Sequence, residues 1–123
     1  MTKLQGKPRP KITIDLKKNR IRVYRETLHM ISDPKYIQLL INPKARKIII
    51  LGSTAYDHTA HKSYSVMDSH SSFELYSRDL MTQIRQINTD LNEGHSFNFI
   101  GRIEQRNTLA VFDICDKRSI IEV

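Results

Sequence analysis

Apolar and polar residues alternate strictly where the regular part of the chain begins. Residues 11–17 read KITIDLK and residues 20–25 read RIRVYR, with isoleucine, leucine or valine at every second position. A period of two is typical of a strand with one buried face, and the intervening residues favour a turn. The pattern therefore predicts a β-hairpin. Its outward ribbon would carry Lys11, Lys17, Arg20, Arg22 and Tyr24.

A second hairpin is predicted in the most apolar part of the chain. Residues 36–41 (YIQLLI) and 47–51 (KIIIL) are almost entirely apolar, which is typical of strands buried on both faces. Asn42 and Pro43 supply turn chemistry between them. The remaining predicted strands are a short one at 63–67, a third hairpin at 96–104 and 108–114, and a last strand at 119–123.

Apolar residues then recur at intervals of three or four across residues 73–91, which is the spacing of one helix face. Ser71 and Glu74 have the spacing of a capping box, and Gly94 is a candidate helix end. The pattern predicts one long helix over approximately Ser72–Leu91. Its packing positions would be Tyr76, Leu80, Ile84 and Ile87.

Short helical turns complete the predicted elements. Thr27 can cap one turn in LHMIS, and Ser32 or Asp33 before Pro34 can start another. Residues 11–123 are thus expected to form a single α+β domain. Its antiparallel sheet of six or seven strands is built from hairpins, with one long helix in the C-terminal half. Residues 1–10 are expected to be a flexible basic arm.

Positive charge is concentrated in the first two-fifths of the chain. Residues 1–47 contain 13 Lys or Arg against three acids, whereas residues 48–123 contain seven against ten. This asymmetry favours a surface that meets a polyanion, although many basic proteins have no anionic partner. The candidate nucleic-acid-binding residues are Lys17, Lys18, Arg20, Arg22, Arg25, Lys44, Arg46 and Lys47, with Tyr24 and Tyr36 as neighbouring aromatics.

No motif in the sequence indicates catalysis. The four glycines are isolated, which excludes a phosphate-cradling glycine loop. The histidine-rich loop at 57–70 has no closed set of zinc ligands, so we expect a solvated loop without metal. We therefore expect no enzyme and no cofactor. One cysteine, an N-terminus without a secretory signal and apolar runs too short for a membrane anchor favour a cytoplasmic protein.

Several segments together resemble a group of small uncharacterised proteins carried by phages and integrative elements of clostridia and related bacteria. They are TLHMISDPKYIQLLINP, KIIILGS, ELYSRDLMTQIRQ, GRIE and AVFDI, within residues 12–114. The resemblance rests on core and turn residues and carries no catalytic motif. It implies a mobile-element context, in which small basic proteins commonly bind DNA or block host defence.

Two functional hypotheses follow. In the first, the basic ribbon of the first hairpin contacts the phosphates of DNA, together with the turn of the second hairpin, which contains Lys44, Arg46 and Lys47. The two-stranded ribbon fits a major groove. In the second, the protein is a non-enzymatic anti-defence inhibitor that captures a host protein or a small nucleotide signal in a pocket at a homo-oligomer interface. Free sheet edges make a homo-oligomer the expected state under either hypothesis.

Overall fold

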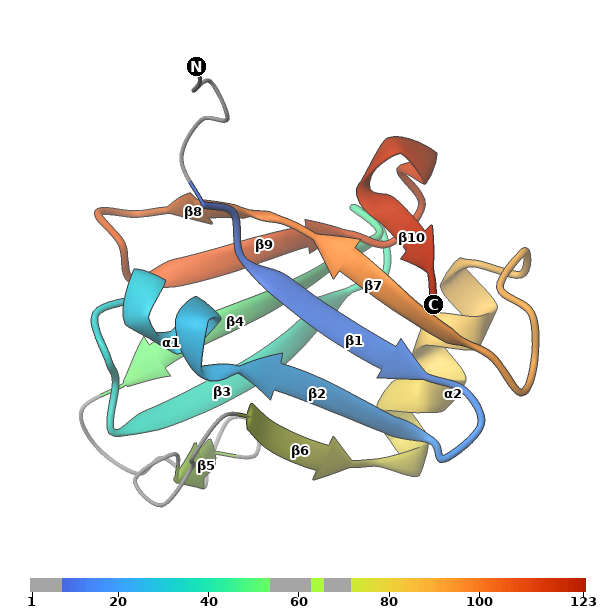
Figure 1. Ribbon diagram of the computed structural model, residues 1–123, viewed down its shortest axis with the longest axis horizontal. Coiled ribbons are helices and arrows are strands. Elements are labelled where there is room, and N and C mark those ends of the chain that lie inside the picture. Colours follow the sequence, from blue (N-terminus) through green and yellow to red (C-terminus); the bar gives the residue numbers. More distant parts are fainter. Residues whose placement is uncertain (1–7, 54–62, 66–71) are drawn as a thin grey trace.

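Two antiparallel sheets packed face to face make up the described part of the chain, which comprises residues 8–53, 63–65 and 72–123 of a computed structural model (Figure 1). In order, the strands of sheet 1 are β10 (Ile120–Glu122), β7 (Ser96–Ile100), β1 (Lys11–Asp15), β2 (Arg20–Tyr24) and β6 (Ser72–Tyr76). Those of sheet 2 are β5 (Ser63–Ser65), β3 (Tyr36–Asn42), β4 (Lys47–Ser53), β9 (Leu109–Asp113) and β8 (Arg102–Glu104). The helices are α1 (Arg25–Met30), α2 (Arg78–Ile87) and a 3₁₀ turn, η1 (Lys117–Ser119).

The predicted α+β class is wrong, because the described residues are mostly β and form ten strands instead of six or seven. Their longest helix, α2, has ten residues. Neither α1 nor α2 has the length and apolar content that crossing a bilayer would require.

The predicted long helix over Ser72–Leu91 is wrong, because residues 72–76 form strand β6 and the helix that follows ends at Ile87, well before Gly94. Phe73 and Leu75 pair with buried residues of β2, and Glu74 faces the other way, opposite Arg22. A period of two is therefore present in FELY, hidden within apolar spacings that also suit a helix. The helix begins only after Ser77, whose Oγ accepts a hydrogen bond from the Leu80 amide at 3.3 Å.

Three of the four predicted packing positions, Leu80, Ile84 and Ile87, are confirmed on α2, and only Tyr76 is wrong. Met81 and Ile84 are fully buried, and Leu80 and Ile87 are partly buried against the same core. Tyr76 precedes the helix and is 60% exposed. The helix closes one end of the space between the sheets (Figure 1).

The two N-terminal hairpins are confirmed, but they lie in different sheets. β1 and β2 pair from Ile12 with Val23 to Asp15 with Arg20, and β3 and β4 pair from Tyr36 with Ser53 to Asn42 with Lys47. Between the hairpins, α1 carries the chain from sheet 1 to sheet 2. The hairpins therefore face each other across the core.

Helix α1 begins at Arg25, so Thr27 lies inside it and is not its N-cap. The buried Thr27 hydroxyl instead ties the helix to β1, since its Oγ1 donates to the Lys11 carbonyl and accepts from the Lys11 amide, both at 2.9 Å. The predicted turn at Ser32 and Asp33 starts no helix, and both residues adopt positive φ.

The predicted strand 96–104 is divided at Gly101, where the chain passes from β7 in sheet 1 to β8 in sheet 2. A Cβ at Gly101 would lie 2.3 Å from the carbonyl oxygen of Val111 and 2.6 Å from the Phe112 ring. Only glycine fits such a close approach. The third hairpin therefore consists of β8 and β9 alone, while β7 pairs with β1 and β10.

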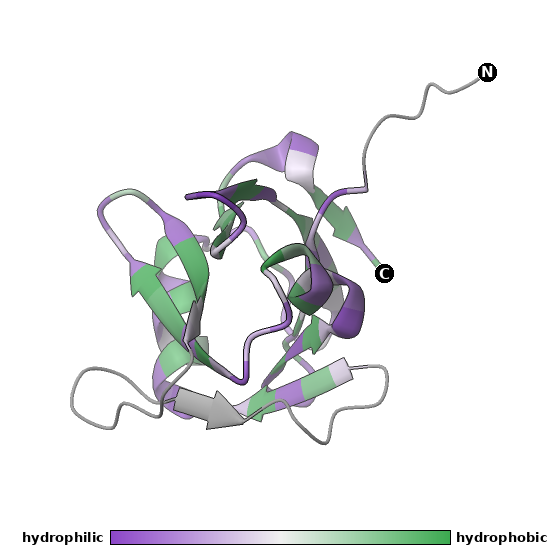
Figure 2. Cartoon of the chain, turned by 90° about the vertical axis from the view of Figure 1, so that its left-hand side faces the viewer, coloured by the Kyte–Doolittle hydropathy of each residue, from purple (hydrophilic) through white to green (hydrophobic). Residues whose placement is uncertain are grey.

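The core lies between the inner faces of the two sheets. Its fully buried side chains include Ile12, Ile14, Ile21, Phe99, Ile37, Ile48, Ile50 and Phe112. Figure 2 views the two layers from one end, coloured by hydropathy. The two faces of β3 and β4 differ, since Ile48 and Ile50 point into the core, whereas Ile49 and Leu51 are only half-buried. The prediction that these strands are buried on both faces is therefore correct for the inner face only.

We predict that Ile84→Ala lowers the free energy of unfolding by about 2–5 kcal/mol, because it leaves a cavity beneath α2. Ile121→Ala is the matched control and should change it by less than about 0.5 kcal/mol, because Ile121 is 55% exposed. Urea denaturation of both variants measures the difference. Equal effects at the two isoleucines would contradict the burial described for α2.

Candidate nucleic-acid interface

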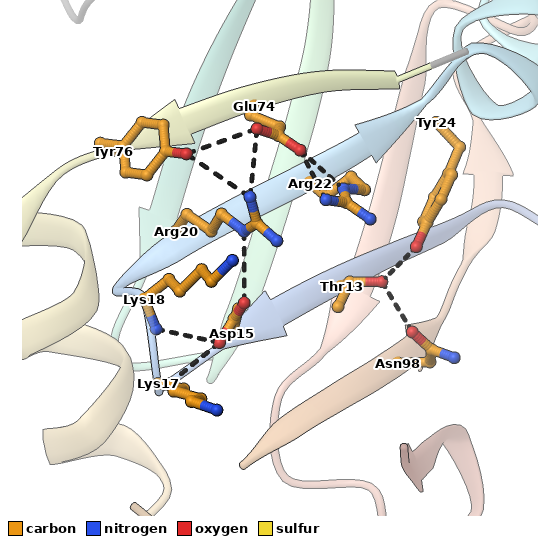
Figure 3. Close-up of polar contacts among 10 residues, drawn as sticks. All are labelled: Thr13, Asp15, Lys17, Lys18, Arg20, Arg22, Tyr24, Glu74, Tyr76 and Asn98. Atoms are coloured by element: carbon orange, nitrogen blue, oxygen red, sulfur yellow. Dashed lines mark hydrogen bonds and ion pairs between the residues drawn. The ribbon is translucent and has the colours of Figure 1, made fainter. Parts of the chain in front are cut away.

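The outer face of sheet 1 gathers polar side chains from four strands (Figure 3). Because strand residues alternate, Thr13 and Asp15 point away from the core that buries Ile12 and Ile14. The strand register continues this surface into β2, β6 and β7. We call it the polar face and define it by Lys11, Thr13, Asp15, Arg20, Arg22, Tyr24, Glu74, Tyr76, Ser96 and Asn98.

Glu74 of β6 holds two arginines of β2 at the centre of the polar face. Arg22 donates from Nη2 and Nε to Glu74 Oε2 at 2.6 and 3.0 Å, and Arg20 donates from Nη1 to Glu74 Oε1 at 3.2 Å. Arg20 also donates from Nε to Asp15 Oδ2 at 3.2 Å. The Tyr76 hydroxyl lies 3.4 Å from Glu74 Oε1. These bonds fix both guanidinium planes before any ligand arrives.

The same contacts set the protonation of the cluster. The hydrogen bond from Arg22, together with the charge of Arg20, lowers the pKa of Glu74. Burial alone would raise the pKa of Asp15, but hydrogen bonds from the backbone amides of Lys18 and Lys17, and the charge of Arg20, outweigh it, so this pKa is also lowered. Both carboxylates are therefore ionised at neutral pH and keep the arginines in place.

A chain of hydrogen bonds orients Asn98 on β7. Thr13 Oγ1 donates to Asn98 Oδ1 at 2.7 Å, so the Tyr24 hydroxyl supplies the proton for its 2.6 Å bond to Thr13 Oγ1. With Oδ1 occupied, the Asn98 amino group points away from Thr13 (Figure 3). Lys11 Nζ lies 4.6 Å from the centroid of the Tyr24 ring, within the range of a cation–π contact.

A hollow of about 190 Å³ lies among these side chains and offers mainly hydrogen-bond donors. It is lined by Thr13, Asp15, Arg20, Arg22, Tyr24, Ser96, Asn98 and Val123. Asp15, its one carboxylate side chain, already accepts bonds from Arg20 and from the amides of Lys17 and Lys18. The guanidinium groups and the Asn98 amino group remain able to donate. The hollow therefore suits a ligand edge rich in acceptors.

The structure brings together only part of the predicted basic patch. Arg20, Arg22 and Tyr24 lie on the polar face, and Lys17 and Lys18 are exposed in the turn beside it. Arg25 is the first residue of α1. The remaining four residues belong to sheet 2 or its β3–β4 turn, and they are Tyr36, Lys44, Arg46 and Lys47.

The turn between β3 and β4 is separate from the polar face because these two strands lie in sheet 2. Lys47 faces the outer side of sheet 2, where its Nζ lies 3.9 Å from Asp113 Oδ1. Arg46 lines a cleft of about 540 Å³ near the end of α2, which also contains Lys117, Asp90 and Glu122. The charges of this cleft are mixed. The ribbon and the second turn therefore do not form one positive stripe.

Sequence reasoning missed Glu74, Tyr76 and Asn98. The predicted helix includes the first two, although the alternation of Phe73 and Leu75 with polar neighbours is a usable strand signal. Asn98 had no comparable signal, because its role depends on β7 pairing with β1. Among the described residues, no three His, Cys, Asp or Glu side chains are grouped to hold a metal ion. Asp57, His58, His61, Asp68 and His70 of the predicted histidine loop lie outside the described residues.

We predict that Glu74→Gln destabilises the protein at neutral pH, and that its difference from wild type shrinks in acid. A carboxylate whose native pKa is lowered contributes stability above its ordinary pKa, near 4.5 for glutamate, and loses it as pH falls through the native value. Urea midpoints between about pH 7 and about pH 2.5 measure this. Glu93→Gln is the control, because Glu93 is a 65% exposed partner of Arg85. A Glu74→Gln effect independent of pH would contradict the lowered pKa.

Comparisons with other proteins assign neither a family nor a function to this chain. No family model matches the chain, and neither curated proteins nor solved structures gave a match. The resemblance to mobile-element proteins therefore stays a prediction, and what the chain does has to be argued from the polar face itself.

Proposed function

We propose that this protein is a non-enzymatic nucleic-acid-binding protein that lays an unpaired strand across the polar face. The observation that carries the proposal is the combination of two tyrosines and two held arginines on the outer face of one sheet (Figure 3). Sheet surfaces of this kind bind single strands by stacking bases on aromatic rings and pairing phosphates with cations. The mobile-element origin suggested by the sequence is compatible with such a role.

The position of the ribbon favours a single strand over a duplex. β1 and β2 are flanked by β7 and β6, so the ribbon is the middle of a five-stranded sheet. Five strands span about 19 Å, whereas a B-DNA major groove is about 12 Å wide. The sheet cannot enter the groove as an isolated two-stranded ribbon could. An unpaired strand can instead lie flat on it.

The net positive charge of the polar face and its turn also suits a phosphate backbone. Lys11, Arg20 and Arg22 on the polar face, with Lys17 and Lys18 beside it, outnumber Asp15 and Glu74. Each guanidinium has five N–H groups, so an arginine bound to a carboxylate keeps donors for a phosphate. The 60% exposed Tyr76 ring offers a stacking surface close to Arg20.

The donor-rich hollow adds a preference among bases. Asn98, Arg20 and Arg22 all line it, and each carries N–H groups. Thymine, uracil and guanine carry keto oxygens that accept such bonds, whereas adenine presents an amino group at the equivalent edge. We infer that the hollow favours a keto base.

Capture of a host protein or a small nucleotide signal at a homo-oligomer interface remains the alternative function. The hollow is about 190 Å³, whereas sites for whole small-molecule ligands usually measure about 300–1,000 Å³. One base or one phosphate fits this space better than a complete signalling nucleotide. The alternative therefore requires a second wall, supplied by another subunit.

We predict that a labelled oligonucleotide of about 12 thymidines is bound, and that Tyr76→Ala weakens binding about tenfold through the loss of a stacked base. Tyr36→Ala, a matched change on sheet 2, should leave affinity unchanged. Fluorescence anisotropy at about 0.15 M salt provides the measurement. Equal affinity for duplex DNA, or no binding of any single strand, would contradict the proposal.

A second prediction concerns the base. Wild type should bind oligothymidine about fivefold more tightly than oligoadenosine, since one net hydrogen bond contributes about 1 kcal/mol. Asn98→Ala should reduce this ratio while keeping most of the affinity, because the phosphate contacts remain. If the ratio is the same in the variant, Asn98 does not read the base.

A further inference from the structure

The outer face of sheet 2 is apolar at its centre, unlike the outer face of sheet 1. By register, Leu40, Ile49 and Val111 form one row across β3, β4 and β9, and Gln38, Leu51 and Leu109 form the neighbouring row. We call the five apolar residues of these two rows the apolar patch. None of them belongs to the cluster of residues packed in the core between the sheets. Four are half-buried, and Val111 is 4% exposed.

The composition of β3 and β4 distinguishes this patch from incidental surface leucines. Residues 39–41 (LLI) of β3 and 48–51 (IIIL) of β4 are apolar at inward and outward positions alike, whereas the outward positions Gln38, Asn42 and Lys47 beside them are polar. Strands that face water on one side alternate, as β1 and β2 do, whereas continuous apolar runs are typical of strands covered on both faces. A contiguous apolar sheet face is a common sign of a protein interface.

Four charged residues, Lys47, Arg102, Glu104 and Asp113, border the patch, and we call them its frame. Lys47 lies opposite Asp113, and Arg102 donates to Asp113 Oδ2 at 2.8 Å and pairs with Glu104 on the same strand. The frame thus holds two cations and two anions, although the chain as a whole carries a net charge of +7. Two copies that approach through the polar face would repel each other. Two copies that approach through sheet 2 bring neutral frames together.

We propose that the apolar patch is the interface of a homodimer, in which sheet 2 of one copy packs face to face on sheet 2 of another. Antiparallel sheets pack this way at about 10 Å in the interior of β-sandwiches. A second copy fits the patch because it offers the same apolar centre. Its frame also contains both signs of charge, so the cations of one copy can lie beside the anions of the other. This arrangement leaves both polar faces outward, on opposite sides of the dimer.

The dimer does not depend on nucleic-acid binding. If both proposals hold, one dimer presents two nucleic-acid-binding faces. A surface that carries many single-stranded oligonucleotides should then retain the dimer longer than one free oligonucleotide does. If only the dimer holds, the oligomeric state below is unaffected by oligonucleotide.

Sedimentation equilibrium of the full chain over a range of concentrations tests the proposal. We expect wild type to be dimeric at about 100 µM, and Ile49→Lys to raise the dissociation constant at least about a hundredfold, because the ammonium group would be buried in a dry contact. Ile121→Lys is the matched control, an exposed isoleucine on the other sheet, and should leave the dimer intact. In the monomer the lysine stem at position 49 can extend to water, so folding should be preserved.

Leu40→Lys, on the neighbouring strand, is the second variant and should act in the same way if Ile49→Lys fails to fold by circular dichroism. A wild-type monomer at this concentration would overturn the proposal. So would a dimer that survives both substitutions, or one that Ile121→Lys abolishes equally. Any of these outcomes would leave the patch as the surface of a monomer or the site of a different partner protein.

Discussion

The structure depends on burying the inner faces of two sheets against each other. Ile12 and Ile14 of β1 and Ile48 and Ile50 of β4 are fully buried between the sheets. Because strand residues alternate, this burial also decides which side chains point outward. A register slip of one residue would carry the polar face into the core. The geometry of the candidate site is therefore a consequence of core packing.

Charge compensation on the polar face has two opposite effects. Glu74 and Asp15 hold Arg20 and Arg22 in fixed positions, which reduces the entropy that a ligand must remove on binding. The same carboxylates reduce the positive potential that attracts a polyanion. Lys17 and Lys18 lie in the exposed turn and bond to Asp15 through their backbone amides. Their side-chain ammonium groups add positive charge beside the polar face. Under the proposed function, the turn would steer association and the sheet would complete it.

The two outer faces of the molecule divide its surface by chemistry. The outer face of sheet 1 carries arginines, tyrosines and an amide, and the outer face of sheet 2 carries a largely half-buried apolar patch bordered by charges of both signs. A sandwich places such faces back to back, so an assembly made through one need not cover the other. Self-association and ligand binding can therefore be changed by separate substitutions.

The sequence by itself determined the two N-terminal hairpins, since a strict period of two in residues 11–17 and two apolar runs around Asn42 and Pro43 leave little choice of local structure. It also determined that β1 and β2 carry cations and a tyrosine outward. Tertiary structure decided that residues 72–76 pair with β2 as a strand, because their apolar spacing suits a helix as well. It also decided that Gly101 divides a strand and that the second turn lies apart from the polar face. Local spacing is set within a few residues, whereas the choice of sheet depends on contacts between residues far apart in the chain.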